Sequence, residues 1–308
     1  MITLSDYLKN TYGEKVYRLS LSSGCTCPNR DGKVGSGGCT FCSEGGSGEF
    51  AAKAQIIEPT DIRKQIEEAK GIISKKTNAR KFIAYFQSYT NTYGDVGRLK
   101  NLYLEAIRQD DIVALSLGTR PVCLGPEVME MLKELQKIKP VWIELGLQTI
   151  HEETARKINR GYELSVFEDA YRRLKEAGIT VIVHVILGLP GESREDMLDT
   201  VRYLASLEPA LDGIKLQNLQ ILKGTEMYRQ FIEDPSAFHI MTMEEYTDLV
   251  AECIALLPKG TVVHRMQGDG PRWLLVEPMW SLDKKRVLNM LTKKISLLFR
   301  QKYPDKMK

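Results

Sequence analysis

Apolar and polar residues alternate along this chain in short runs, and between these runs apolar residues recur at helical spacing. Six runs rich in branched and aromatic residues predict strands at 15–21, 81–87, 112–117, 141–147, 180–187 and 213–221. Six amphipathic stretches predict helices at 59–74, 97–108, 126–135, 165–177, 194–207 and 243–257. Repeated alternation of strand and helix favours parallel strands joined by right-handed crossovers. The sequence therefore predicts an α/β fold, a partial (β/α)6 barrel related to the eight-unit TIM barrel.

The predicted barrel covers residues 1–260, and a C-terminal extension covers 261–308. Residues 283–308 hold nine Lys or Arg against two Asp, although the whole chain has a net charge of only +3. Apolar residues recur there at helical spacing: Val287, Leu288, Leu291, Ile295 and Leu298. We expect a basic amphipathic helix. Its charged face is either solvated surface or a contact for nucleic-acid phosphates.

Composition excludes a membrane-spanning chain and favours a cytoplasmic protein. The 308 residues are 43% hydrophobic, and no apolar run approaches the roughly 20 residues of a membrane span. The start, MITLSD, lacks the basic region of a secretory signal. Six cysteines without an export signal argue against a disulfide framework.

Candidate chemistry concentrates in a glycine-rich loop at 24–48, directly after the first predicted strand. Three of its cysteines are Cys27, Cys39 and Cys42. Three thiolates would leave one iron of a [4Fe–4S] cluster open, because such clusters normally have four Cys ligands. With Cys25 as a fourth ligand, the same loop would instead close a tetrahedral zinc site. In barrels of this kind chemistry gathers at the C-terminal ends of the strands, where this loop begins.

Alternation along the predicted strands places polar side chains inside the barrel. Glu144 and Gln148 share one face of VWIELGLQ, and Lys215 and Gln217 share one face of the run at 213–221. A buried carboxylate needs a partner, so Glu144 binds ribose hydroxyls or an amino group, or forms an ion pair with an inward Lys or Arg. His184 lies on an apolar strand, where a satisfied core histidine is commoner than a ligand.

Further polar groups follow the predicted strands. Gln87, Ser88 and Thr90 end the second strand with an amide and hydroxyls, and Arg120 follows the third, from where it would reach the barrel interior. Residues 188–193, GLPGES, leave a strand and open a helix that Ser193 would cap. They match neither a Walker loop nor the dinucleotide fingerprint.

Together these motifs resemble those of radical S-adenosylmethionine (SAM) enzymes. The chain is more narrowly similar to the YtqA/YhcC family (MnmL-like), which is related to the catalytic subunit of Elongator. The resemblance rests on CPNRDG…GGCTFC, AYFQSYTNTY, LSLGTRP, ELGLQT…INRGY, HVILGLPGES, DGIKLQNLQILKGT and HRMQGD, and covers nearly the whole chain.

The resemblance implies two cofactors. A [4Fe–4S] cluster would be bound by Cys27, Cys39 and Cys42, with Cys25 outside the motif. SAM would be bound by Phe41, Gln87, Ser88, Thr90, Glu144, Gln148, His184, Gly188, Glu192 and Gln217. Residues 87–90 depart from the usual Gly-Gly-Glu of the SAM amino-group motif.

The resemblance also implies an activity. The reduced cluster would cleave SAM to a 5′-deoxyadenosyl radical, which abstracts hydrogen from the substrate. The expected substrate is the C5 side chain of tRNA wobble uridine, trimmed from carboxymethylaminomethyl to aminomethyl. Candidate catalytic residues are Lys215, Arg265 and Gln267, and Arg272 would hold a carboxylate or phosphate with them.

Expected partners are tRNA, a reductant such as flavodoxin or ferredoxin, and a downstream methyltransferase. Two alternatives remain: a radical SAM enzyme acting on a small molecule or a protein side chain, and a zinc-bearing RNA-binding protein.

Overall fold

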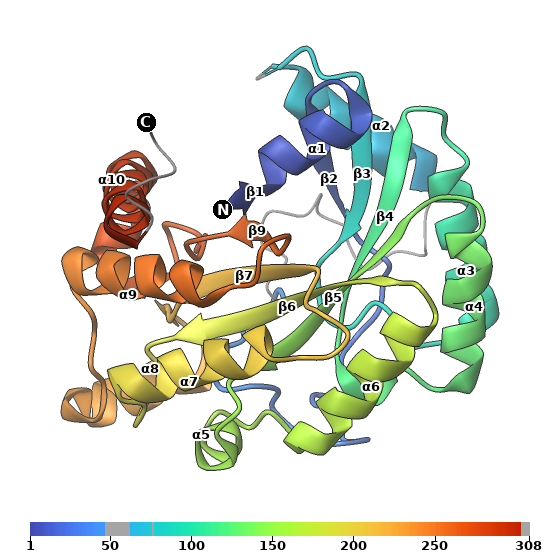
Figure 1. Ribbon diagram of the computed structural model, residues 1–308. Coiled ribbons are helices and arrows are strands. Elements are labelled where there is room, and N and C mark those ends of the chain that lie inside the picture. Colours follow the sequence, from blue (N-terminus) through green and yellow to red (C-terminus); the bar gives the residue numbers. More distant parts are fainter. Residues whose placement is uncertain (47–61, 76, 303–308) are drawn as a thin grey trace.

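Eight parallel strands form one curved sheet in the order β1-β9-β7-β6-β5-β4-β3-β2 (Figure 1). The computed structural model describes residues 1–46, 62–75 and 77–302. The strands of this sheet are β1 (Ile2–Thr3), β2 (Val16–Leu21), β3 (Lys81–Phe86), β4 (Ile112–Thr119), β5 (Val141–Gln148), β6 (Thr180–Leu187), β7 (Gly213–Asn218) and β9 (Val262–Arg265). Since β1 and β2 are the two ends of the sheet, the barrel is open, and the predicted α/β partial barrel is confirmed.

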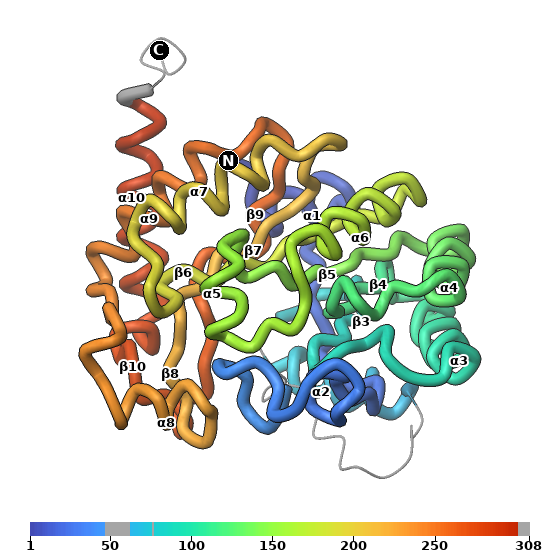
Figure 2. Tube along the Cα trace, turned by 90° about the horizontal axis from the view of Figure 1, so that it is seen from below, coloured from blue at the N-terminus to red at the C-terminus, as the bar shows by residue number. Residues whose placement is uncertain are grey.

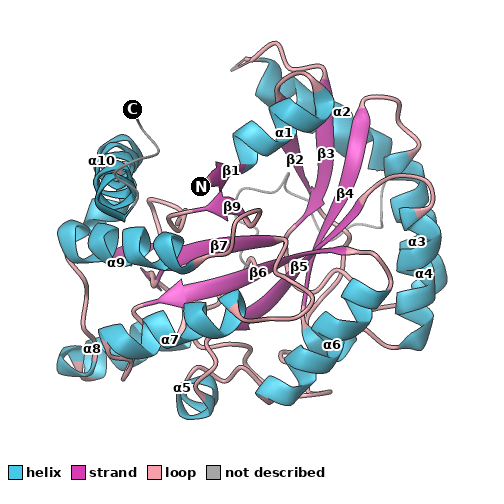
Figure 3. Cartoon of the chain, in the orientation of Figure 1, coloured by secondary structure: helices cyan, strands magenta, loops and turns pink. Residues whose placement is uncertain are grey.

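Helices cover the outer face of this sheet (Figure 3). The helices of the described part are α1 (Leu4–Tyr12), α2 (Ile62–Ser74), α3 (Val96–Ile107), α4 (Pro126–Gln136), α5 (Glu152–Lys157), α6 (Leu164–Glu176), α7 (Arg194–Ala205), α8 (Glu226–Glu233), α9 (Met243–Leu256) and α10 (Lys284–Lys302). Among them, α10 packs on α9 and not directly on the sheet. Helix α1 differs from the others because it contacts β1, β9 and β2, and so bridges the two ends of the sheet. None of the helices in the described part is long and apolar enough to cross a membrane.

The predicted elements correspond to β2–β7, to six of the helices and to the basic helix α10. Residues 59–61 of the first predicted helix lie outside the described residues, as do 47–48 of the cysteine loop and 303–308 of the basic segment. The predicted strand at 213–221 was too long: it ends at Asn218, and β8 (Ile221–Leu222) pairs with β10 (Leu275–Glu277) in a separate two-stranded sheet.

Strand β9 joins the barrel sheet although it follows residue 260. The domain boundary placed there from the sequence stays a prediction. Strands β1 and β9 escaped prediction because two and four residues are too few to show an alternating pattern.

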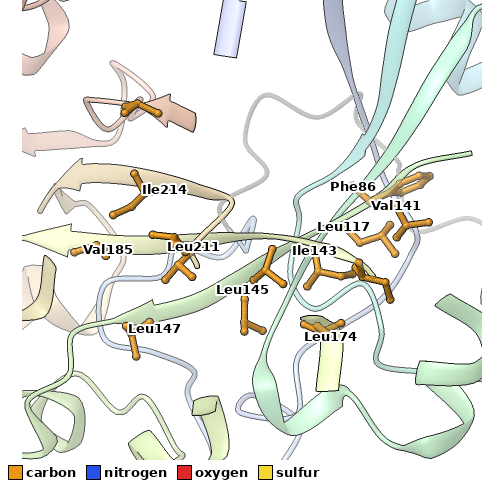
Figure 4. Close-up of a cluster of buried hydrophobic side chains, with 14 of the residues drawn as sticks. Phe86, Leu117, Val141, Ile143, Leu145, Leu147, Leu174, Val185, Leu211 and Ile214 are labelled. Carbon is orange, nitrogen blue, oxygen red and sulfur yellow. The ribbon is translucent and has the colours of Figure 1, made fainter. Parts of the chain in front are cut away.

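The main hydrophobic core lies between the sheet and the outer helices. Figure 4 shows part of it, including Phe86, Leu117, Ile143 and Leu145, all fully buried. Burial of each such side chain contributes about 1.5–3 kcal/mol to folding before opposing terms. These residues alternate with the inward-facing ones, so the packing that builds the core also fixes which side chains point into the barrel.

A second, smaller core fills the N-terminal end of the barrel. The strands contribute Val16, Ile83, Ala114, Trp142 and Ile182, and α1 contributes Leu8. All six side chains are buried. This apolar layer closes one end of the barrel, so the polar interior described below opens toward the C-terminal ends of the strands, the C-terminal rim.

Candidate active site

The cysteine loop leaves β2 at the C-terminal rim and packs beside α5 (Figure 2). The backbone N–H of Thr40 donates to the carbonyl of Ile158 at 3.0 Å, and the N–H of Met227 donates to the carbonyl of Thr40 at 2.8 Å. Nδ2 of Asn29 donates to the carbonyl of Asn159 at 2.7 Å. Contacts with distant parts of the chain therefore set the conformation of the loop.

The loop holds Cys39 in a polar, cationic environment. Nη1 of Arg120 lies 3.3 Å from Sγ of Cys39, and Nδ2 of Asn29 lies 3.7 Å from the same sulfur. A nearby cation and a hydrogen-bond donor favour the thiolate form that ligates metals. Arg120 therefore contacts the cysteine loop, and its role in holding a substrate carboxylate or phosphate stays a prediction.

Cys25 also lies beside a guanidinium group, but burial outweighs its effect on the thiol. Its Sγ is 3.6 Å from Nη2 of Arg98, and burial raises the pKa of the Cys25 thiol. None of the six cysteines, all of which lie in the described part of the chain, forms a disulfide.

The cysteines do not form a site for a single metal ion. Among the described residues, which include Cys25, Cys27, Cys39 and Cys42, no three His, Cys, Asp or Glu side chains lie close enough to hold one ion. A cluster offers separate irons to separate thiolates, so three cysteines in a glycine-rich loop fit it without meeting at one point.

Unpartnered polar atoms gather around the loop. In the described part of the chain, the buried side-chain atoms without a hydrogen-bond partner are Oδ1 of Asn29, Oγ1 of Thr40, Oγ1 of Thr90 and Nε of Arg120. Buried polar groups are normally satisfied, so their concentration at one place indicates a polar ligand there. The residues present therefore fit a cofactor held at this loop.

Backbone strain occurs at the same rim. Tyr89, Gln148 and Asn159 are the described non-glycine residues with positive φ, at 58°, 66° and 51°. Asn159 donates from Nδ2 to the carbonyl of Gly38 at 2.7 Å, and the N–H of Tyr89 donates to the carbonyl of Gly46 at 3.0 Å. Such conformations cost free energy and tend to persist at functional sites.

Some of the residues predicted to bind SAM lie in the cysteine loop or against it. The N–H of Thr90 donates to the carbonyl of Thr26 at 3.3 Å, which places residues 87–90 against the loop. Phe41 packs against an apolar cluster that includes Ile158 and Met227. Gly188 has φ of 92°, and a Cβ there would lie 2.9 Å from Cε of Met241. The SAM roles of Phe41, Gln87, Ser88, Thr90 and Gly188 stay predictions.

Glu192 and Gln148 hold neighbouring segments together. The hydroxyl of Thr149 donates to Glu192, and burial raises the pKa of Glu192. The hydroxyl of Tyr162 lies 3.4 Å from Oε1 of Gln148. Ser193 caps α7 in a capping box with Asp196, as its position after the strand predicted.

Below the rim, Glu144 and Lys215 form a fully buried ion pair. Oε2 of Glu144 also accepts from the Tyr85 hydroxyl at 2.8 Å and contacts Nε2 of His184 at 3.0 Å, while Oε1 accepts from Ser116 at 3.2 Å. Burial alone would raise the pKa of Glu144, but the charge of Lys215 and the bond to His184 outweigh it, and that pKa lies well below its usual range. The ion pair was one of the two alternatives that the sequence left open. The ribose contact of Glu144 stays a prediction.

His184 is engaged in the same network. Burial and the nearby charge of Lys215 lower the pKa of His184 to about 4, so its imidazole is neutral near pH 7. Its side chain is 19% exposed, and its SAM contact stays a prediction.

The remaining predicted residues lie on the side of the barrel near β9. Nη1 of Arg265 donates to Oε1 of Gln217 at 3.2 Å. The side-chain amide of the buried Gln267 donates to the carbonyl of Ser281, a contact that holds the C-terminal loop. Catalytic roles for Lys215, Arg265 and Gln267, and a SAM contact of Gln217, stay predictions.

Sequence reasoning missed Arg18, and it included His264 only as the first residue of the HRMQGD motif. Arg18 lies over the ring of Tyr85, with its Cζ 5.3 Å from the ring centroid, and its Nη2 is 3.4 Å from Nδ1 of His264. The signal was present, because Arg18 shares the inward face of its strand with Val16.

Comparisons with known proteins agree with this geometry. The Radical SAM superfamily model matches residues 25–204, and the Radical SAM C-terminal domain model matches residues 211–296. The chain therefore belongs to the radical SAM superfamily, whose members use a [4Fe–4S] cluster and SAM. Within it the chain groups with YtqA of Bacillus subtilis, at 39% identity over 95% of this chain and 88% of the relative. YhcC of Escherichia coli is 36% identical over 89% and 85%, respectively.

A solved structure supports the fold. Elp3 of the archaeon Methanocaldococcus infernus matches with a TM-score of 0.67 at 17% identity, covering 91% of this chain and 63% of that one.

Proposed function

We propose that this radical SAM enzyme modifies the C5 side chain of the wobble uridine in tRNA, converting a carboxymethylaminomethyl group to aminomethyl. The resemblance to the YtqA/YhcC family and to Elongator's catalytic subunit suggests this substrate. One structural observation supports an RNA substrate: a basic and aromatic surface at the C-terminal rim, which we call the rim patch. It comprises Lys223, Arg272, Trp273, Lys284, Lys285 and Arg286, all exposed.

Backbone and ionic contacts tie the rim patch to the barrel. The N–H of Lys223 donates to the carbonyl of Leu274 at 2.8 Å, and Lys284 pairs with Asp269. The N–H of Gly268 donates to Oδ1 of Asn218, the last residue of β7, at 2.9 Å. The patch therefore begins where the barrel strands end.

The chemistry of the patch suits single-stranded RNA. Trp273 is 64% exposed, and an exposed indole among cations offers a stacking surface for a base beside contacts for phosphates. Both would be needed to hold an anticodon loop while one base enters the barrel.

Helix α10 extends this basic surface along the outside of the barrel. Its apolar face is buried through Val287, Leu291 and Ile295, and Lys294 pairs with Asp248 of α9 at 2.6 Å. On the described part of α10, the exposed cations that make no ion pair with a described residue are Lys285, Arg286, Lys293 and Arg300. The helix is thus docked and still presents a basic face.

Each part of the chain has a defined task in this proposal. Bound SAM and the cluster supply a substrate-activating radical. The cysteine loop and rim residues hold both cofactors, the apolar layer at the N-terminal end excludes water, and the rim patch holds the RNA.

The test is mass spectrometry of tRNA nucleosides from cells with and without the gene. We expect carboxymethylaminomethyluridine to accumulate and its aminomethyl-derived products to disappear when the gene is deleted. Complementation with the wild-type chain should reverse both changes, and the Cys39→Ala variant should not. An unchanged profile in cells that express the gene would move the substrate to a small molecule or a protein side chain.

A further inference from the structure

One layer of the barrel interior carries more positive than negative charge. Among the described residues, the charged side chains that act on one another there are Arg18 of β2, Glu144 of β5, Lys215 of β7 and Arg265 of β9. Lys215, 1% exposed, is paired with Glu144, whose side chain is fully buried. The two guanidinium groups remain as an excess.

The direct contacts of both guanidinium groups are with neutral groups, and the carboxylate of Glu144, already paired with Lys215, acts on Arg18 only at longer range. Arg18 contacts the Tyr85 ring and Nδ1 of His264, and Arg265 donates to the amide oxygen of Gln217. Burial, with Arg18 acting in the same direction, holds the pKa of His264 well below its ordinary value, so this imidazole adds no charge of its own. Neither Arg18 nor Arg265 makes an ion pair with a residue in 1–46, 62–75 or 77–302.

Both guanidinium groups, of Arg18 and Arg265, act electrostatically on Lys215. The register between β7 and β9 shifts just before Lys215 and Arg265, a bulge that lets both His264 and Arg265 reach the interior layer. Burial lowers the pKa of Lys215 well below its ordinary value, and Arg18 and Arg265 both push in that direction. Both guanidinium groups therefore lie in the electrostatic neighbourhood of one ammonium group.

An anion would relieve this repulsion. Partly buried like charges without a counter-ion cost free energy, and a bound carboxylate returns it through charge-assisted hydrogen bonds. Arg18 and Arg265 are half-buried and so accessible to solvent. Because the apolar layer closes the N-terminal end, a ligand reaches them from the C-terminal rim, past the cysteine loop that follows β2.

We propose that Arg18 and Arg265 together form a receptor for a carboxylate of the substrate inside the barrel. The planar fork of each guanidinium suits the two oxygens of a carboxylate. This inference deepens the proposed function and rests on it, since the N-carboxymethyl group of the proposed substrate ends in such a carboxylate. The receptor would hold that end of the side chain and so position its methylene carbons near the cofactors.

The test compares acids with their amides on the loaded enzyme under anaerobic conditions. The first probe pair is N-benzylglycine and its primary amide, which contain no nucleoside. The second pair is 5-carboxymethylaminomethyluridine and its primary amide. In the wild-type protein we expect the acid of each pair to bind roughly 10- to 100-fold more tightly than its amide.

Substitutions then show which residues cause the preference for the acid over its amide. Arg18→Gln and Arg265→Gln should each reduce the acid-over-amide ratio to within a few fold of one, while SAM affinity is unchanged. Arg173→Gln on the outer helix α6 is the matched control and should keep the ratio. Removing an uncompensated cation should also leave the melting temperature of the ligand-free protein unchanged or raise it, whereas loss of a purely structural arginine would lower it.

The outcomes separate the two proposals. An acid preference for N-benzylglycine together with an unaltered tRNA profile would uphold the receptor and overturn the wobble-uridine substrate. Processing of tRNA by an enzyme that binds acids and amides equally would overturn the receptor. If Arg18→Gln weakens SAM binding as much as acid binding, the guanidinium groups hold the carboxylate of SAM, and the inference is wrong.

Discussion

Arg18 on β2 and His264 on β9 meet across the open side of the barrel, with Nη2 of the arginine 3.4 Å from Nδ1 of the histidine. An arginine can only donate, so this nitrogen of His264 is the acceptor and the imidazole is neutral. Two residues 246 positions apart thus connect the two sides of the open sheet through the barrel interior. Helix α1 connects the same two sides at the N-terminal end of the barrel.

The neutral histidines of this interior make stability depend on pH. His184 has a folded pKa of about 4 against roughly 6.5 when unfolded. The unfolded chain therefore binds a proton first, and stability is lost as pH falls below about 6.5 toward 4. His184 alone should account for about 2 kcal/mol between pH 6.5 and 5.

Thermal unfolding of variants across this pH range checks this prediction. His184→Gln should show a shallower loss of melting temperature than the wild type. His239→Gln, with a side chain 71% exposed, should keep the wild-type slope. Equal slopes in wild type and His184→Gln would contradict the assignment.

Breaking the buried ion pair of Glu144 and Lys215 should lower the free energy of unfolding. Glu144→Gln leaves an uncompensated ammonium in the barrel interior and should cost about 3–5 kcal/mol of unfolding free energy. The double variant Glu144→Gln with Lys215→Met should recover much of that loss, because neither charge remains. Denaturant unfolding measures the free energy of unfolding of both variants. As a control, Arg229→Gln breaks an exposed pair with Glu226 and should lower that free energy by at most about 1 kcal/mol.

The three-cysteine assignment predicts unequal effects of two alanine variants. Cys39→Ala should lose most bound iron and all production of 5′-deoxyadenosine, because it removes a cluster ligand. Cys25→Ala should keep both. Iron and sulfide analysis after anaerobic reconstitution measures the first, and chromatography of the reaction the second. Matching losses in both variants would restore a four-cysteine site.

Arg120 should raise the reduction potential of the cluster. Its guanidinium lies 3.3 Å from Sγ of Cys39, and a cation so placed favours the more negative, reduced state. Arg120→Gln should therefore shift the midpoint to a more negative value in a redox titration followed by EPR. Arg120→Lys keeps the charge and should shift it less; a positive shift in Arg120→Gln would refute the argument.

The basic face of α10 should give tRNA binding its salt dependence. Replacing Lys285 and Arg286 by Gln should weaken binding at low salt and flatten the plot of log affinity against log salt, because each phosphate contact releases counterions. As a control, Lys133 of α4 and Lys137, the residue that caps the C-terminus of α4, are exposed across the barrel from α10, and replacing both by Gln should leave the slope unchanged (Figure 1). An identical slope in both double variants would remove α10 from the RNA interface.

The inward-facing residues were predictable because strand alternation is a local property. The period of two in VWIELGLQ places Glu144 inside, and the same rule applied to β2 would have found Arg18. That Glu144 meets Lys215 depends on the register of β5, β6 and β7, which depends in turn on packing across the whole sheet.

The surroundings of the cysteines were not predictable in the same way. Spacing and glycine content located the loop, but Arg120 and Asn159 reach it from segments far along the chain. Their side chains contact it only because the strand ends converge at one rim. Short elements such as β1, β9 and α5 carry too few residues to show a period, and tertiary pairing alone defines them.

The proposed cofactor site and the proposed carboxylate receptor lie on different parts of the barrel. The cysteine loop and the segments around it contact the rim, whereas Arg18 and Arg265 lie on β2 and β9, on either side of the opening in the sheet. Exchanges at these two positions change the charge offered to a substrate without touching a cysteine. A change of substrate at this receptor therefore requires exchanges on the strands and none in the cysteine loop.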